Sequence, residues 1–553
     1  MILVCVSLES EVFCETFSLF VRLPSYSEQR CVLRLRDVAR IAQIALGQQT
    51  WRENAGKVEA FIQAMGVNMS VTMPPEPDTQ VVAKSNHQLL AAMGRDLDGR
   101  LLFPDDEAYA FAAWPNNARW AHIRPCAIAV CANERDVARC INWARENGQP
   151  FVIRSGGHSY AGFSTTSGLL IDVKEMNRVD LDLKNGTVTV QGGANNQDMA
   201  IALRSHEVAV PAGRCATVGV AGLVLGGGWG FSASRSGLTC DSLLASQAVL
   251  ASGALVDVCS QSEPDLFWAM KGGGGGNFAV HTSFTFQLHA VREVTAFHIE
   301  WPPEKQIQVL RALQILQINH PRQISTRTKA RPLQVGPLPS RDQIRVETLG
   351  MFWGSKADLL DALAPVFGVL APAVTEINTM DFWSARDYLL TDDPFGLYDL
   401  RSSYVAHSLS EEALDTMLSW MSRWPGGSVA QENLGILFAM GGKVNDVAAT
   451  ASAYFHRNAN FIFEMEAQWG PIDAPALINR QKQWLAQYFE AMQPYVLPQS
   501  YQNFMNRDLP NWAHAYYGAN LPRLCQIKRD YDPDNLFRFA QSIPLQPPGI
   551  GAV

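Results

Sequence analysis

The sequence lacks the cysteine patterns that mark metal sites and disulfide frameworks. Its ten cysteines are scattered, none forms a CxxC pair, and no cluster of histidine and cysteine has zinc spacing. An isolated cysteine behaves as a small apolar residue, most often buried as a thiol. We therefore expect no disulfide framework and no metal site, and a reducing compartment is favoured.

The sequence also has little charge and no long apolar run. Charged residues make up 18% of the chain, with a net charge of −8 and no basic stripe, which argues against a nucleic-acid partner. No apolar stretch reaches about 18 residues, so no membrane helix is expected. The apolar residues 1–6 lack a basic flank and are followed by Glu9, Glu11 and Glu15. This does not fit a signal peptide, so the location stays open with the cytoplasm favoured.

A chain of 553 residues is long enough for two or three domains. Its first part mixes apolar patches with a possible helix over 33–64, and it ends in the proline-rich loop 73–78. The expected parts are an N-terminal extension of undecided role, a first domain, a second domain and a C-terminal segment that folds back onto the first domain: 1–85, 86–292, 293–500 and 501–553.

The local patterns predict an α+β protein. The first domain shows a helix and strand-like runs bounded by glycine and asparagine, and the last two runs form a hairpin: helix 136–147, strands 127–131, 151–154, 168–172, 187–191, 245–250 and 256–259. In the second domain, helices alternate with strands, which indicates helices packed over a sheet: helices 303–318, 356–370, 411–423 and 474–492, strands 345–352, 403–407 and 461–469.

Two reactive side chains lie inside glycine-rich turns. His158 lies in Arg-Ser-Gly-Gly-His-Ser-Tyr (154–160), and Cys215 lies in Gly-Arg-Cys-Ala-Thr-Val-Gly (213–219). Glycine lets the backbone approach a ligand closely. A lone histidine or cysteine is more often structural, but the shared context favours two attachment points for one flat cofactor. The glycine run 272–276 would present backbone N–H groups to a pyrophosphate.

These motifs, with Asp-Leu-Phe-Trp-Ala (265–269), Tyr-Tyr-Gly-Ala-Asn-Leu (516–521) and Tyr-Asp-Pro-Asp-Asn-Leu-Phe (531–537), occur in the order of a known family. Residues 116–292 and 500–545 resemble the berberine-bridge-enzyme-like FAD-linked oxidoreductases of the vanillyl-alcohol-oxidase superfamily. The resemblance implies a PCMH-type FAD-binding domain of two α+β subdomains. It also implies a substrate domain whose antiparallel sheet is covered by helices, and a berberine-bridge-like C-terminal segment.

The resemblance further implies FAD joined covalently through His158 to the flavin 8α-methyl and through Cys215 to C6. Val218 matches the position that controls oxygen access, where a small side chain favours oxidase behaviour; simple packing of this valine is the alternative. The cofactor-binding residues that it implies are Arg154, Ser155, Gly156, Gly157, His158, Ser159, Gly162, Gly213, Cys215, Val218, Gly219, Gly222, Gly226, Gly227, Gly228, Gly276, Asn277, Val280, Tyr516 and Asn520.

The sequence departs from the family at the catalytic base. Members often carry a tyrosine where this chain has Phe504, and phenylalanine does no acid–base chemistry. Tyr501, Tyr404 and Glu466 are the substitute candidates, with Tyr388 and Tyr398 as further possibilities.

The function expected from these features is that of an FAD-dependent oxidase. It would remove hydride from an alcohol, in a sugar or a secondary metabolite, with molecular oxygen as acceptor. Two alternatives stay open. One is a flavin dehydrogenase with a non-oxygen acceptor. The other is a flavin-loaded binding protein with little turnover, which the missing tyrosine at position 504 suggests.

Overall fold

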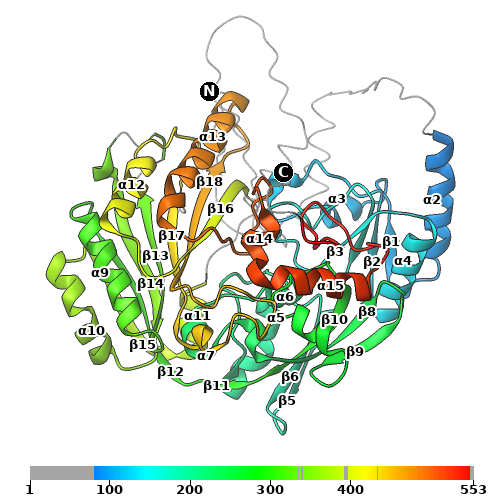
Figure 1. The fold of residues 1–553 in the computed structure, drawn as a ribbon, viewed down its shortest axis with the longest axis horizontal. Coiled ribbons are helices and arrows are strands. Elements are labelled where there is room, and N and C mark those ends of the chain that lie inside the picture. The colour runs from blue at the N-terminus through cyan, green and yellow to red at the C-terminus, as the bar shows by residue number, and fades with distance from the viewer. Residues whose placement is uncertain (1–79, 334, 338–339, 391–395, 432–433, 549–553) are drawn as a thin grey trace, which may run out of the picture. The chain divides into compact units, whose positions relative to one another are not determined.

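The computed structural model describes residues 80–548 except 334, 338–339, 391–395 and 432–433 (Figure 1). The expected helix over 33–64 and most of the N-terminal extension lie outside the described residues. Residues 82–553 form one compact unit. The boundaries at 292 and 500 therefore stay a proposal about function and not an observed division. The α+β class is confirmed, because helices and three larger sheets are interleaved along the chain.

The first sheet has the strand order β1-β2-β4-β3, with β2 and β3 both parallel to β4. All side chains of β2 and β4 are buried, as expected for parallel strands covered on both faces. Helix α4 (Glu134–Glu146) begins at the N-cap Asn133 and lies between β2 and β3 in the chain. The strands are β1 Arg100–Leu102, β2 Ala127–Val130, β3 Phe151–Arg154 and β4 Leu169–Asp172.

The second sheet is antiparallel throughout, in the order β5-β6-β10-β8-β9. The predicted hairpin is confirmed as β8 and β9, which turn at Gly253 with a positive φ of 82°. The strands are β5 Val179–Asp182, β6 Thr187–Gln191, β8 Leu243–Leu250, β9 Leu255–Cys259 and β10 Ala279–Gln287.

Short elements connect and flank these two sheets. The helices are α2 Gln80–Gly94, α3 Tyr109–Ala112, α5 Asn196–Leu203, α6 Val220–Leu225, α7 Ala233–Ser236 and α8 Pro264–Ala269. The two-stranded ribbon is β7 Val208–Ala209 with β11 His289–Ala290.

The third sheet is antiparallel and has seven strands in the order β15-β12-β14-β13-β17-β18-β16. Helices α9, α10, α12 and α13 cover one of its faces (Figure 1). The strands are β12 Glu293–Trp301, β13 Ile324–Pro332, β14 Ile344–Phe352, β15 Val374–Asp381, β16 Leu397–Val405, β17 Gly435–Ala439 and β18 Phe461–Trp469. The helices are α9 Gln306–Asn319, α10 Lys356–Val369, α11 Phe382–Tyr388, α12 Glu411–Met421 and α13 Pro475–Met492.

Two helices, α14 (Trp512–Tyr517) and α15 (Leu521–Tyr531), lie near the C-terminus, and a buried ion pair at the end of α15 fixes the tail. The Lys528 ammonium lies 2.7 Å from Asp532, and neither side chain is exposed. The same ammonium donates to the carbonyl oxygens of Asn277 and Phe537. A buried charge is tolerated only with such partners, so the pair ties the tail to the loop before β10.

None of the helices among the described residues combines the length and apolar character needed to span a bilayer. The described cysteines form no disulfide bond with one another.

Candidate active site

The turn before His158 and the turn after Cys215 touch through their glycines. A Cβ atom at Gly156 would lie 2.3 Å from the Gly219 nitrogen, and a Cβ at Gly219 would lie 2.4 Å from the Gly156 nitrogen. Any side chain at either position would push the turns apart. The glycines predicted from the motif are therefore required for this contact, which joins two distant parts of the chain.

The start of α5 holds the second turn in place. The Asn196 side chain donates to the Cys215 carbonyl oxygen at 2.8 Å, and its backbone N–H donates to the Val218 carbonyl oxygen at 3.1 Å. The Gln197 backbone N–H donates to the Ala216 carbonyl oxygen at 3.0 Å. The turn thus has a fixed backbone, as a reactive thiol needs if it is to meet a ligand at one place.

A cavity of about 240 Å³ opens over both turns. His158 and Cys215 both line it, and His158 Nε2 lies 3.0 Å from the Thr217 hydroxyl of the second turn. The predicted site residues that line the cavity are Ser155, Gly156, Gly157, His158, Ser159, Gly213, Cys215, Val218, Gly219, Gly222, Gly276, Val280 and Tyr501. The structure therefore brings most of the predicted cofactor residues together.

The other predicted residues lie outside the cavity lining and hold backbone in place. Arg154 donates to the carbonyl oxygens of Ala112 and Ser164, and Asn520 donates to those of Ala449 and Ser452. Glycines at some motif positions pack against rings or side chains instead of facing a ligand. The predicted residues outside the lining are Arg154, Gly162, Gly226, Gly227, Gly228, Asn277, Tyr516, Asn520, Tyr404 and Glu466.

The cavity suits a flat, anionic cofactor. A Cβ added to Gly222 would meet no atom within 4 Å, so the backbone of α6 faces open space there. Among the described residues that line the cavity, none is an aspartate or a glutamate, whereas Arg214 and Arg538 are present. Open glycine backbone with positive and no negative charge fits a diphosphate. The residues present therefore fit FAD.

Phe504 lines the cavity within a group of aromatic rings. Its ring centre lies 5.0 Å from Tyr501, 5.5 Å from Phe438 and 5.6 Å from Tyr160. The Tyr160 hydroxyl has no hydrogen-bond partner among the described residues, and Tyr160 also lines the cavity. The position to which the family resemblance assigns the base is thus apolar, and the Tyr160 phenol lies beside it.

The predicted substitutes for the base differ in their surroundings. The Tyr501 oxygen accepts hydrogen bonds from Gly228 N–H and Asn503, yet burial raises the pKa of Tyr501 to about 12. Tyr404 hydrogen-bonds Tyr454 away from the cavity lining, and burial places its pKa well above the usual range. Both phenols are neutral at pH 7, so neither accepts a proton readily.

Glu464 is the acidic group that sequence reasoning missed. It lies on β18 opposite Ser402 and Ile436, it is 1% exposed, and its Oε2 has no hydrogen-bond partner. Burial raises the pKa of Glu464 to about 7, although the guanidinium groups of Arg214 and Arg327 lower it.

Glu464, like Glu466, is outside the cavity lining, but it lies on the face of the sheet toward the cavity. Phe438 of β17 contacts Trp229 and Phe504, which line the cavity. Ile436 shares the face of Phe438, and Glu464 pairs with Ile436. Glu466 shares that parity, so strand alternation alone could not choose between the two glutamates. The deeper burial of Glu464 and the neighbouring charges of Arg214 and Arg327 favour it over Glu466 as the acidic group of the site.

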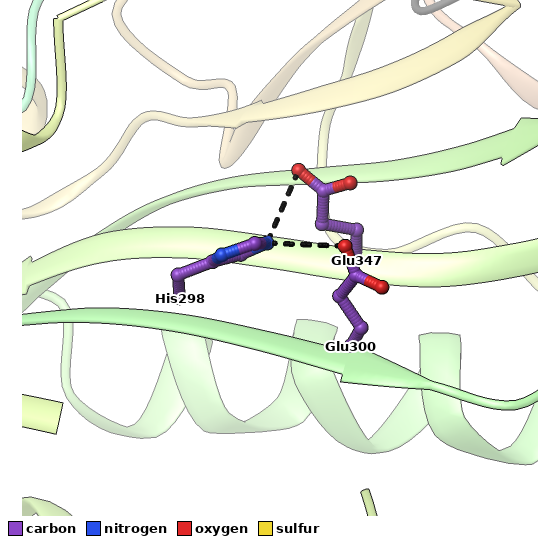
Figure 2. Close-up of side chains that lie close together, drawn as sticks. All are labelled: His298, Glu300 and Glu347. Atoms are coloured by element: carbon purple, nitrogen blue, oxygen red, sulfur yellow. Dashed lines mark ion pairs between the residues drawn. The ribbon is translucent and has the colours of Figure 1, made fainter. Parts of the chain in front are cut away.

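A second charged group lies further along the same sheet. His298, Glu300 and Glu347 offer ligand atoms within 4.8 Å of one another (Figure 2). Burial would raise the pKa of Glu347, but the neighbouring His298 and basic side chains lower it to about 2. The cations that pair with these two carboxylates are Lys329, Arg331 and Arg345. With the carboxylates already neutralised, we interpret this group as an ion-pair network and not as a metal site.

Comparison with known proteins supports FAD as the cofactor. The family model "FAD binding domain" matches residues 125–258, and the model "Berberine and berberine like" matches residues 500–544. The uncharacterized FAD-linked oxidoreductase YgaK of Bacillus subtilis is 32% identical over 81% of this chain and 97% of its own length. This chain belongs to the berberine-bridge-enzyme-like FAD-linked oxidoreductases.

Two further relatives extend the comparison. Reticuline oxidase of Eschscholzia californica is 27% identical over 76% of this enzyme and 83% of its own length. The solved structure of BBE-like 1 from Physcomitrella patens has a TM-score of 0.73 at 28% identity, over 83% of the enzyme and 99% of that chain. The PCMH-type fold predicted from the sequence is confirmed by this likeness.

Filling the open face of α6 should exclude the cofactor. We expect Gly222→Leu to fold but to lose most of its bound flavin, because the new side chain enters the cavity without meeting protein. The measurements are visible absorbance of the purified protein and its thermal unfolding. Gly368→Leu is the matched control, since Gly368 is also a helical glycine with open space around it but lies in α10. Full flavin loading of Gly222→Leu would contradict this placement.

Proposed function

We propose that this enzyme is an FAD-dependent oxidase that removes hydride from an alcohol, with flavin attached through both His158 and Cys215. The observation that carries the proposal is that these two side chains line one cavity over two glycine turns in contact. Bound FAD would supply the acceptor for the hydride that leaves the substrate carbon, and oxygen would be the final acceptor, giving hydrogen peroxide.

Both anchors have the chemistry that attachment requires. An imidazole nitrogen and a cysteine sulfur are nucleophiles that form covalent bonds to electron-poor carbon. Thr217 holds the His158 ring from the second turn, and Asn196 holds the Cys215 backbone. Each anchor is thus positioned by a group on the other turn or on α5, which keeps both directed at the same ligand.

We propose Glu464 as the proton acceptor and Tyr160 as the group that orients the substrate hydroxyl. General-base catalysis works best when the pKa of the base lies near the operating pH. The pKa of Glu464, about 7, meets that condition, whereas that of Tyr501, about 12, does not. Tyr160 lines the cavity, no described residue hydrogen-bonds its hydroxyl, and the Glu464 charge acts on it.

The proposed substrate class follows from the aromatic residues that line the larger cavity. Tyr160, Trp229, Tyr501 and Phe504 all line the cavity and offer flat ring faces. Such faces stack on sugar rings or aromatic metabolites. Reticuline oxidase is named for an alkaloid substrate, which supports a secondary metabolite, and a carbohydrate fits the same walls.

Oxygen as the acceptor rests on Val218. Val218 lines the same cavity as Cys215, and it is the position where the family resemblance places oxygen access and where a small side chain favours an oxidase. A dehydrogenase with another acceptor is the alternative, and kinetics separate the two.

Reoxidation of the reduced enzyme tests the oxidase proposal. After reduction by dithionite, we expect the flavin to reoxidise within seconds in air-saturated buffer and to release peroxide. Val218→Leu should slow that step while leaving flavin reduction by substrate unchanged. A panel of sugars, alcohols and amines with peroxide detection then identifies the substrate class. Reoxidation over many minutes, with no peroxide from any alcohol, would mean a dehydrogenase.

The pH profile tests the role of Glu464. Because Glu464 must be deprotonated to accept a proton, we expect kcat/KM to rise with pH through about 7 and then level off. Glu464→Gln should lower kcat/KM by about 10²–10⁴-fold and remove that rise. Flavin content should be unchanged.

Glu466→Gln is the matched control for Glu464→Gln, because Glu466 is a buried glutamate on the same face of β18. It should keep the pH profile of the wild type. If kcat/KM fell in Glu466→Gln but not in Glu464→Gln, the base would be Glu466, which is one of the candidates from the sequence.

A further inference from the structure

A second cavity, of about 30 Å³, lies on the other side of the Gly213–Arg214 segment, which lines both cavities. Its remaining walls come mainly from α5 and from α11 with the residues after it. It therefore lies between α5, which holds the Cys215 turn, and α11, which comes between β15 and β16 of the seven-stranded sheet in the chain.

Two buried polar atoms belong to residues of this wall and have no hydrogen-bond partner among the described residues. They are Oδ1 of Asn196, which is 1% exposed, and Nε1 of Trp383, which is 9% exposed. Buried donors and acceptors are nearly always paired, and water commonly supplies the missing partner.

The orientation of both groups is fixed by their other contacts. Asn196 Nδ2 donates to the Cys215 carbonyl oxygen at 2.8 Å, and a flipped amide would set two oxygens against each other there. The Trp383 ring packs edge-on against Phe382, 5.3 Å away between centroids, with the Arg204 guanidinium 6.0 Å from its centre. One acceptor and one donor are therefore held at the cavity.

A single ligand that satisfies both atoms must donate a hydrogen bond to Asn196 Oδ1 and accept one from Trp383 Nε1. Water does both, whereas a metal cation cannot accept, a simple anion cannot donate, and molecular oxygen forms neither bond well. A cavity needs a volume of about 10–15 Å³ to hold one buried water. This cavity has a volume of about 30 Å³. We propose that this cavity binds an ordered water that bridges Asn196 and Trp383 and completes a clamp on the Cys215 turn.

Direct bonds from the same helix form the rest of the clamp. Arg386 of α11 donates to the Gln197 side chain at 2.8 Å and to the Asn196 carbonyl oxygen at 3.3 Å. Asn196 and Gln197 in turn bond the backbone of the Cys215 turn. Trp383, through the water, and Arg386 are thus positioning residues for Cys215. Their effect on the sulfur link rests on the proposed function, but the water itself does not.

A crystal structure of the flavin-loaded wild type, at a resolution that shows ordered solvent, tests the water directly. We expect a density peak within hydrogen-bond distance of both Asn196 Oδ1 and Trp383 Nε1. An empty cavity, or a Trp383 indole turned to a protein acceptor, would overturn the proposal whatever the state of the flavin links.

Trp383→Phe tests the clamp, because phenylalanine keeps a ring but removes the donor. Trp424→Phe is the matched control: Trp424 is buried, its Nε1 also lacks a partner, and it lines neither cavity. Peptide mass spectrometry measures the share of flavin carried on the Cys215 peptide. We expect a several-fold fall in Trp383→Phe, with the His158 link retained, and no change in Trp424→Phe.

The outcomes separate the clamp from the proposed function. If the share of flavin on the Cys215 peptide were equal in Trp383→Phe and Trp424→Phe, the positioning role of Trp383 would be overturned. A wild type without any sulfur link would contradict the proposed bicovalent flavin and the positioning role built on it, and the crystal density would still decide whether the water site exists.

Discussion

The close contact between the backbones of Gly156 and Gly219 is the constraint on which the rest of the site depends. It exists only because neither residue has a side chain, since a Cβ at either position would come within 2.4 Å of the other's nitrogen. The contact places His158 on one turn and Cys215 on the other over a single cavity. Without it, the two nucleophiles would belong to separate surfaces, and no one ligand could meet both.

Support for these turns comes from parts of the chain that are far apart in sequence. The start of α5 bonds the Cys215 turn, and α11, which comes between β15 and β16 of the seven-stranded sheet in the chain, bonds the start of α5. The same sheet presents Glu464 toward the cavity with Arg214 and Arg327 acting on its charge. In the proposed function, cofactor attachment and acid–base chemistry are therefore assigned to different elements. This proposed division would let the chain carry Phe504 where the family resemblance places the base and still have a proton acceptor.

The sequence predicted the parts that depend on local pattern. Alternation and periodicity located β14, β18, α10 and α13, and the glycine motifs located His158 and Cys215. The motifs could not separate ligand-facing residues from supporting ones. Arg154 and Asn520 belong to the same motifs, yet both hold backbone carbonyls, because a tight turn needs buried donors as well as exposed glycine. Glu464 was missed because its proposed role depends on burial and on the charges of Arg214 and Arg327, which lie elsewhere in the chain.

The measurement that tests the central claim most directly is peptide mapping of the denatured, proteolysed holoenzyme. We predict one flavin-containing species in which the His158 peptide and the Cys215 peptide are joined through the same flavin, and a yellow pellet after acid precipitation. His158→Ala and Cys215→Ala should each leave the flavin on the other peptide alone. If acid precipitation of the wild type released the flavin into the supernatant, with none attached to either peptide, the result would contradict the account.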